Sequence, residues 1–204
     1  MRGKFITFEG SEGCGKSTQS KLLHRYLKAN GHDVVYLREP GGTKISEKIR
    51  KILLDARNTG MDVQCEMLLY MASRAQIVTE IIRPSLKQGK IVICDRFLDS
   101  TLAYQGYGLG MDKTLIRSIG YFATGGLKPD LTIFLDLPVE KGLNVRKRAK
   151  DRIEQRSIDY HKRVRRGYLM LAKIEPKRIK IVKVAKEKAA TQENIRSIIK
   201  KYAI

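Results

Sequence analysis

A glycine-rich segment near the N-terminus combines residues that are suited to holding phosphate groups. Gly10, Gly15, Lys16 and Ser17 occupy the fixed positions of the phosphate-loop pattern. Its glycines let backbone N–H groups converge, Lys16 can reach the β- and γ-phosphates, and the Ser17 hydroxyl can ligate Mg²⁺. The residues expected to bind a nucleoside triphosphate are Gly10, Ser11, Glu12, Gly13, Cys14, Gly15, Lys16, Ser17 and Thr18.

The residues on either side of this loop indicate that it joins a strand to a helix. An apolar, β-prone run (Phe5, Ile6 and Phe8) precedes it, and apolar residues recur with helical spacing after it. A helix that begins here directs the positive end of its dipole at a bound phosphate. The alternative, a glycine-rich turn without a ligand, is disfavoured because strand, loop and helix occur together in the required order.

A second polar pair, Asp95 and Arg96, directly follows a buried-type strand predicted at residues 90–95. A carboxylate at this place can hold Mg²⁺ through its waters, opposite Ser17. Arg96 offers a bidentate fork that suits a phosphate group. The alternative is a surface ion pair between neighbours, which the apolar strand before it disfavours.

Strand and helix patterns alternate along the whole chain. Strands are predicted at residues 5–8, 33–37, 90–95, 131–136 and 178–184. Helices are predicted after the phosphate loop, at 45–54, at 62–88 with a kink at Pro84, at 99–104, 113–124 and 157–172, in a stretch whose first turn holds Pro138, and in a final helix with Thr191 as N-cap. Several strands are too apolar to face water, so we expect an α/β fold of three layers. It would be a five-stranded parallel sheet with helices on both faces and its sites at the carboxyl ends of the strands.

Composition and charge narrow the class of protein. The 204 residues, without a Pro- or Ser-rich linker, predict a single domain over residues 1–204. Cys14, Cys65 and Cys94 are widely spaced and odd in number, which favours a reduced, cytoplasmic setting over a disulfide framework. The net charge of +20 suits either a nucleic acid or phosphate-rich small substrates, and residues 141–183 hold 16 Lys and Arg against 4 Asp and Glu.

Four longer motifs resemble the thymidylate kinase family, in order and over nearly the whole chain. They are the segments 38–43 (REPGGT), 47–50 (EKIR), 95–106 (DRFLDSTLAYQG) and 126–138 (GLKPDLTIFLDLP). The resemblance implies the P-loop NTPase fold with a short mobile lid at about residues 144–155. It also implies an enzyme that uses ATP and Mg²⁺ to convert dTMP to dTDP in dTTP synthesis, and a homodimer formed through the long helices.

The resemblance assigns roles in binding the base and sugar of dTMP. Arg74 resembles the arginine that donates to thymine O4, an edge at which cytosine carries a donor instead. Tyr70, one helical turn earlier, resembles the aromatic that stacks on the base. Ser100 and Gln105 resemble residues that line the thymine pocket, where a glutamine amide can read N3–H and a carbonyl together. Tyr104 resembles the tyrosine that excludes a 2′-hydroxyl.

Further residues are assigned to the acceptor phosphate and to the lid. Glu12 stands where the family carries an acidic residue near the acceptor's 3′-hydroxyl and phosphate, and Arg50 and Arg96 are the expected phosphate clamps, with Arg38 a weaker candidate. The phosphate loop holds no arginine, which implies that lid arginines stabilise the transferred group. Arg148 and Arg152 are the leading candidates and Arg146 follows them. The expected catalytic residues are Lys16, Arg96, Arg148 and Arg152, and Ser17 and Asp95 are the expected metal ligands.

Two alternatives to this activity remain open at this point. One is another deoxynucleoside or nucleotide kinase, which the motif at residues 95–106 disfavours. The other is a nucleic-acid-binding protein with a regulatory nucleotide loop, which the charge of +20 motivates. The charged stretches lack the interleaved aromatics that stack bases, so we do not expect a nucleic acid as partner. No apolar run approaches the roughly 18 residues that a membrane span needs, so we do not expect a membrane either.

Overall fold

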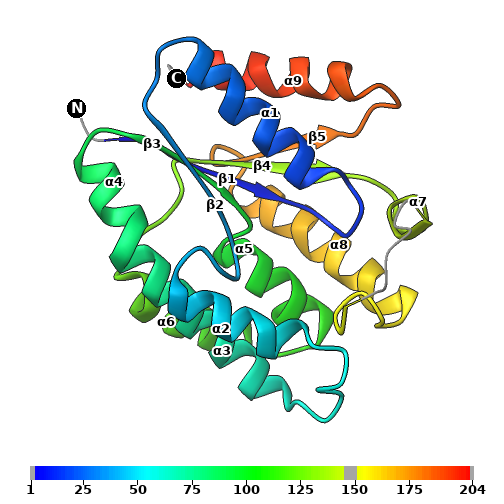
Figure 1. Ribbon diagram of the computed structural model, residues 1–204. Helices are drawn as coiled ribbons and strands as arrows, with labels where there is room; N and C mark the ends of the chain where they lie inside the picture. Colours follow the sequence, from blue (N-terminus) through cyan, green and yellow to red (C-terminus); the bar gives the residue numbers. More distant parts are fainter. Residues whose placement is uncertain (1–2, 145–150, 203–204) are drawn as a thin grey trace.

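The centre of the molecule is a five-stranded parallel sheet with strand order β2-β3-β1-β4-β5 (Figure 1). The computed structural model describes residues 3–144 and 151–202. The strands are β1 (Phe5–Glu9), β2 (Val34–Arg38), β3 (Ile91–Asp95), β4 (Leu131–Asp136) and β5 (Ile179–Lys183). Every residue of β1 and β3 is buried, as expected for central strands covered on both faces. The predicted sheet is therefore confirmed.

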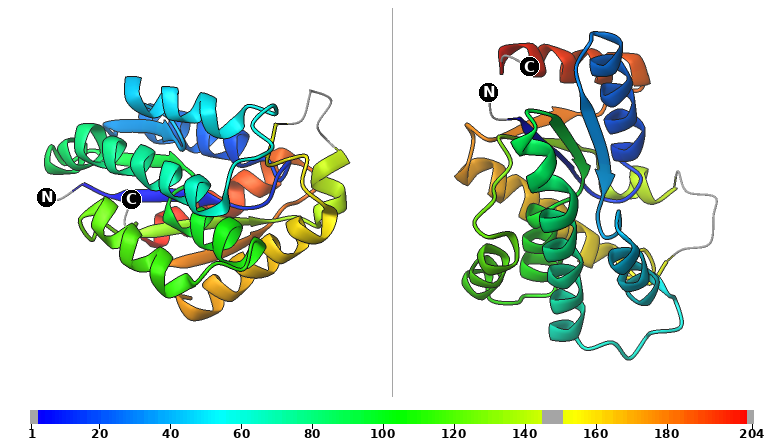
Figure 2. Two further views of the ribbon diagram at one scale, coloured as in Figure 1. Left: turned by 90° about the horizontal axis from the view of Figure 1, so that it is seen from below. Right: turned by 60° about the vertical axis from the view of Figure 1, so that its left-hand side comes forward.

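Helices cover both faces of this sheet. On one face α1 (Lys16–Ala29) packs beside α9 (Lys188–Lys201), as the right-hand view of Figure 2 also shows. The opposite face is covered mainly by α8 (Ile158–Ile174) and α4 (Arg83–Lys87). The remaining helices are α2 (Lys44–Leu54), α3 (Val63–Ile77), α5 (Leu98–Thr101), α6 (Lys113–Thr124) and α7 (Val139–Asn144).

The long helical pattern at residues 62–88 forms three consecutive pieces. Asp62 caps α3 by accepting hydrogen bonds from the N–H groups of Gln64 and Cys65. A wider π-helical turn, η1 (Val78–Ile82), then leads into α4. Pro84 explains the change, because it has no N–H to donate and its ring displaces the carbonyl one turn earlier. A second π-helical segment, η2 (Leu102–Gly108), continues α5.

Two helix starts differ from the sequence-based expectation. The final helix begins at Lys188, so Thr191 lies within its first turn and does not cap it. The Thr191 hydroxyl instead accepts a hydrogen bond from the N–H of Ala185, which ties the helix to the end of β5. Pro138 likewise precedes α7, and its carbonyl accepts from the N–H of Gly142. Within the described part of the chain, no helix is long and apolar enough to cross a membrane.

Candidate active site

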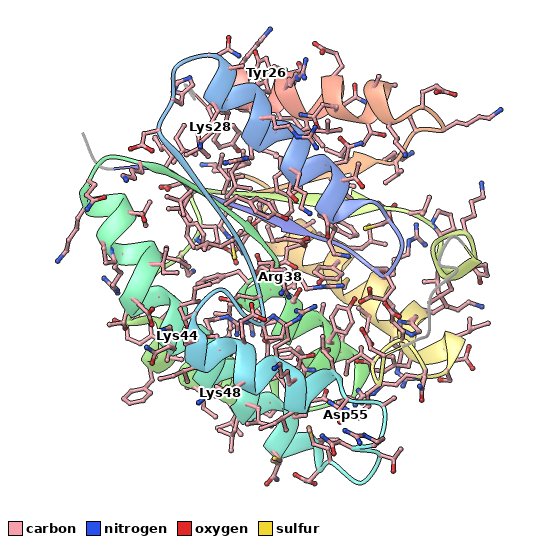
Figure 3. The ribbon with its side chains drawn as sticks, in the orientation of Figure 1. Tyr26, Lys28, Arg38, Lys44, Lys48 and Asp55 are labelled. Atoms are coloured by element: carbon pink, nitrogen blue, oxygen red, sulfur yellow. The ribbon has the colours of Figure 1, made fainter. Side chains whose placement is uncertain are left out.

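A cavity of about 600 Å³ lies at the carboxyl ends of the strands. It gathers residues from the phosphate loop, from α2 and α3, and from the segment that follows β3. Arg38, which ends β2 and lines the cavity, is labelled in Figure 3. The cavity-lining residues predicted from the sequence are Glu12, Gly13, Gly15, Lys16, Ser17, Thr18, Arg38, Arg50, Tyr70, Asp95, Arg96, Ser100, Tyr104 and Gln105.

The phosphate loop runs from β1 into the start of α1, as predicted. Lys16 is the first residue of α1, and its ammonium group folds back over the loop to donate to the Ser11 carbonyl at 2.8 Å. The Lys16 side chain is mostly buried, with only 6% of the residue exposed. The helix start and this buried cation together make the loop strongly attractive to anions.

The loop also makes an unusually close backbone contact with α7. Gly13 has a φ of +70°, and a Cβ placed on it would lie 1.9 Å from the Gly142 carbonyl oxygen. A Cβ on Gly142 would lie 2.2 Å from the Glu12 carbonyl oxygen. Neither position has room for a side chain, because the obstructing atoms are backbone on both sides.

Ser17 and Asp95 meet across the base of the cavity. The Ser17 hydroxyl donates to the Asp95 carboxylate, although the two residues belong to α1 and β3. A hydroxyl and a carboxylate are hard oxygen ligands of the kind that Mg²⁺ prefers when phosphate oxygens and waters complete its shell. This pair therefore fits the predicted magnesium site.

Arg96 lines the cavity and forms hydrogen bonds with several of its other lining residues. It has a φ of +76°, uncommon outside glycine, and its backbone N–H donates to the Phe8 carbonyl. Its guanidinium donates to Glu12 at 2.6 Å, to Tyr104 at 2.9 Å and to Ser100 at 3.1 Å. Four predicted site residues, one of them from the phosphate loop, are thereby brought into one hydrogen-bonded cluster.

Two members of this cluster were not predicted individually. The buried carboxylate of Glu9 accepts hydrogen bonds from the Phe97 N–H at 2.8 Å, from Ser100 at 2.6 Å and from Tyr168 at 3.0 Å. Burial, and next to it the charge of Asp99, raise the pKa of Glu9 to about 7. Glu9 lies at the carboxyl end of a buried strand, and this position could have identified it as a site residue. Tyr168 looks like an ordinary helix aromatic in the sequence.

Some of the expected base-binding residues line the cavity, but Arg74 does not. Tyr70 and Gln105 line the cavity. Arg74 is only 1% exposed and does not line it. Its guanidinium donates to Glu39 at 2.9 Å and to Thr101 at 3.0 Å, two residues that do line the cavity. Arg74 therefore lies one layer behind the wall, and its contact with a base carbonyl stays a prediction.

Glu39, the carboxylate that binds Arg74, has a shifted pKa. Burial raises the pKa of Glu39 to about 7, and the adjacent Arg74 charge opposes that rise only in part. Arg50, which the sequence predicts to bind the acceptor phosphate, lines the cavity, and its guanidinium donates to the Pro40 carbonyl at 2.8 Å. Burial, followed by the charge of Arg38, lowers the pKa of Arg50.

One of the expected lid arginines, Arg152, is nearly buried and does not line the cavity. Its guanidinium binds the Leu53 carbonyl at 3.0 Å and the carboxylate of Glu66 at 2.6 Å. The reason is electrostatic, because Glu66 is completely buried and draws the nearby cation. Arg148 and Arg146 lie outside the described residues, as does half of the expected lid.

Known proteins of one family are similar to this chain in sequence and in fold. The family model for thymidylate kinase matches residues 8–195. A thymidylate kinase of Desulfovibrio desulfuricans is 49% identical, covering 97% of this chain and 95% of the relative. One from Thermoanaerobacter sp. is 47% identical, covering 99% and 100%. The solved structure of a thymidylate kinase from Ehrlichia chaffeensis superposes with a TM-score of 0.82 at 35% identity, covering 98% of this chain and all of that one. The chain therefore belongs to the thymidylate kinase family.

Proposed function

We propose that this protein transfers the γ-phosphoryl group of ATP to dTMP, forming dTDP and ADP, in the synthesis of dTTP. The observation that carries the proposal is that the phosphate loop, Arg50 and Arg96 all line the same cavity. An acceptor phosphate oxygen would attack the γ-phosphorus in line, while the bond to the β-γ bridging oxygen breaks. The chain needs no nucleophile of its own in this scheme.

The donor side of the cavity suits ATP. The loop N–H groups and Lys16 would bind the β- and γ-phosphates, with Gly10, Ser11, Glu12, Gly13, Cys14, Gly15, Ser17 and Thr18 forming the rest of the ATP site. Ser17 and Asp95 would hold Mg²⁺, whose charge would offset that of the phosphates. Arg148 is proposed to act from the lid on the transferred group. The same proposed role for Arg152 is supported by the family resemblance alone, because in this structure its guanidinium is paired with Glu66.

The acceptor side suits a deoxynucleoside monophosphate. Arg96 and Arg50 would bind the phosphate of dTMP, and the hydrogen bonds from Arg96 to Glu12 and Tyr104 would hold its fork in place. Tyr104 lines the cavity beside Arg96 and is proposed to exclude a 2′-hydroxyl.

The base would be read by residues of α3 and of the segment that follows β3. Tyr70 is proposed to stack on thymine, and Ser100 and Gln105 to line its pocket. The support for Arg74 comes from the family resemblance, because in this structure its guanidinium is paired with Glu39. Its hydrogen bonds to Glu39 and Thr101, which both line the cavity, connect Arg74 to the cavity wall.

A turnover assay with a panel of acceptors tests the function. Purified protein is incubated with ATP, Mg²⁺ and each of dTMP, dUMP, dCMP, UMP and thymidine, and ADP release is followed. We expect dTMP to be converted fastest and a chelator such as EDTA to stop the reaction. Equal or faster turnover of another acceptor would identify a different nucleotide kinase. Salt-sensitive retention of single-stranded DNA without turnover of any acceptor would favour the nucleic-acid-binding alternative.

We further propose that the protein is a cytoplasmic homodimer. Free thiols at Cys14, Cys65 and Cys94 suit a reducing compartment. For the dimer, the support is the exposed apolar surface of the packed helices α3 and α6, where Phe122 is 87% and Leu68 50% exposed.

A charge placed on this surface tests the dimer. Phe122→Glu is expected to convert the protein to a monomer at micromolar concentration, because two carboxylates would have to be buried at the interface. Light scattering after size-exclusion chromatography measures the mass. The matched change Ile174→Glu, at an exposed position on α8, should leave the mass unchanged. A monomeric unmodified protein would contradict the proposal.

A further inference from the structure

Glu66 is a completely buried carboxylate in the first turn of α3. One of its oxygens, Oε1, accepts a hydrogen bond from the side-chain amide nitrogen of Gln105 at 2.7 Å. The other, Oε2, binds the guanidinium groups of Arg152 and Arg156, each at 2.6 Å. A base-pocket residue and two arginines from the segment before α8 therefore converge on one carboxylate.

This arrangement determines which way the Gln105 amide faces. An ionised carboxylate has no hydrogen to donate, so only the NH₂ group of Gln105 can face Glu66. Its carbonyl oxygen is then turned to the other side of the amide. Among the residues that the structure describes, none donates a hydrogen bond to that oxygen, although Gln105 lines the cavity. The oxygen is thus available as an acceptor for a ligand.

We infer that Glu66 is a specificity-determining positioning residue, which makes Gln105 present a hydrogen-bond acceptor to the base. The inference rests on the proposed function. Thymine carries a hydrogen on N3 and can donate to this oxygen, whereas N3 of cytosine is itself an acceptor and would oppose it. Glu66 thereby selects against cytosine without touching the nucleotide.

Because Arg152 and Arg156 also bind Glu66, a single substitution at this position should turn the Gln105 amide around. In Glu66→Gln, the introduced amide has one oxygen and one NH₂ group, and it must place them on opposite sides. Arg152 and Arg156 have only donors, so they hold the oxygen on their side. The NH₂ group is left facing Gln105, which must turn its own oxygen toward position 66. Gln105 would then present a donor to the cavity.

The expected result is a loss of discrimination between thymine and cytosine. For Glu66→Gln, kcat/KM for dTMP should fall and the competitive inhibition constant of dCMP against dTMP should fall as well. We expect the preference for dTMP over dCMP to drop by about ten- to a hundredfold, since a favourable hydrogen bond becomes an unpaired contact for one base and the reverse for the other. Both constants are measured by ADP release at fixed ATP.

Two controls separate this effect from a merely structural role. Uracil has the same N3–H and carbonyl oxygens as thymine, so the preference for dTMP over dUMP should stay unchanged in Glu66→Gln. The matched substitution Glu175→Gln also removes a carboxylate that pairs with an arginine, Arg178, but it lies outside the cavity lining. It should leave the dTMP-to-dCMP preference unchanged.

A proportional loss of activity toward all acceptors, with an unchanged dTMP-to-dCMP preference, would overturn the inference. If Glu66→Gln folds poorly, the exchange Glu66→Gln with Gln105→Glu keeps the number of charges and again turns an acceptor toward the base. That variant should prefer dTMP over dCMP, and equal use of both would overturn the inference. Failure of the unmodified protein to phosphorylate dTMP would instead remove the proposed function.

Discussion

Replacing Lys16 with alanine is expected to lower kcat/KM for dTMP phosphorylation by about 10²- to 10³-fold, the range seen when one preorganised charge-stabilising donor is removed. Lys16 supplies the cationic side chain of the phosphate loop, and its ammonium group is already held over the loop by the Ser11 carbonyl. Because the side chain is mostly buried, its interaction with phosphate is poorly screened by solvent. Steady-state ADP release with ATP and dTMP varied in turn measures the loss.

A lysine on the same helix provides the control for this prediction. Lys21 is exposed on α1, beyond the cavity lining, so Lys21→Ala should retain the activity of the unmodified protein. Thermal unfolding of both variants shows whether each is folded at the assay temperature. Activity of Lys16→Ala within a few-fold of the unmodified protein would remove the phosphate loop from the mechanism.

Arg96→Ala is expected to cause the second large loss, also about 10²- to 10³-fold in kcat/KM, together with a raised KM for dTMP. The guanidinium contacts Glu12, Tyr104 and Ser100 at once. Its removal takes an ion-pair partner from the buried Glu12 carboxylate and removes the hydrogen bonds that connect these lining residues. Arg96→Lys should restore little, because a single ammonium group cannot reproduce a planar fork with several fixed donors.

The control for Arg96 is an arginine at the other end of the sheet. Arg83 donates to the carbonyls of Thr124 and Gly125, away from the cavity. Arg83→Ala should therefore change the thermal midpoint more than the kinetics. An unchanged KM for dTMP in Arg96→Ala would contradict the assignment of Arg96 as a phosphate clamp.

Much of the fold could be predicted because its signals are local. The five strands are short apolar runs between turn residues, and each was found within two residues of its observed bounds. The carboxyl ends of parallel strands meet at one edge, which is why the phosphate loop and Asp95 could be expected at one site. The start of α9 was missed because Thr191 has an N-cap residue type but pairs with Ala185 instead.

The partners of buried charges could not be predicted in the same way. Glu66 and Arg152 are 86 positions apart, and only the packing of the segment before α8 against α3 brings them together. The sequence shows that both are charged but not that each neutralises the other. The same holds for Arg74, whose contacts with Glu39 and Thr101 depend on how three separate segments pack.

The backbone contact between Gly13 and Gly142 has a mechanical consequence. At Gly13 and Gly142 the backbones of the phosphate loop and α7 are in direct contact, so a displacement of one is passed to the other. Seating a nucleotide in the loop and shifting α7 are therefore expected to be one motion, observed from its two ends.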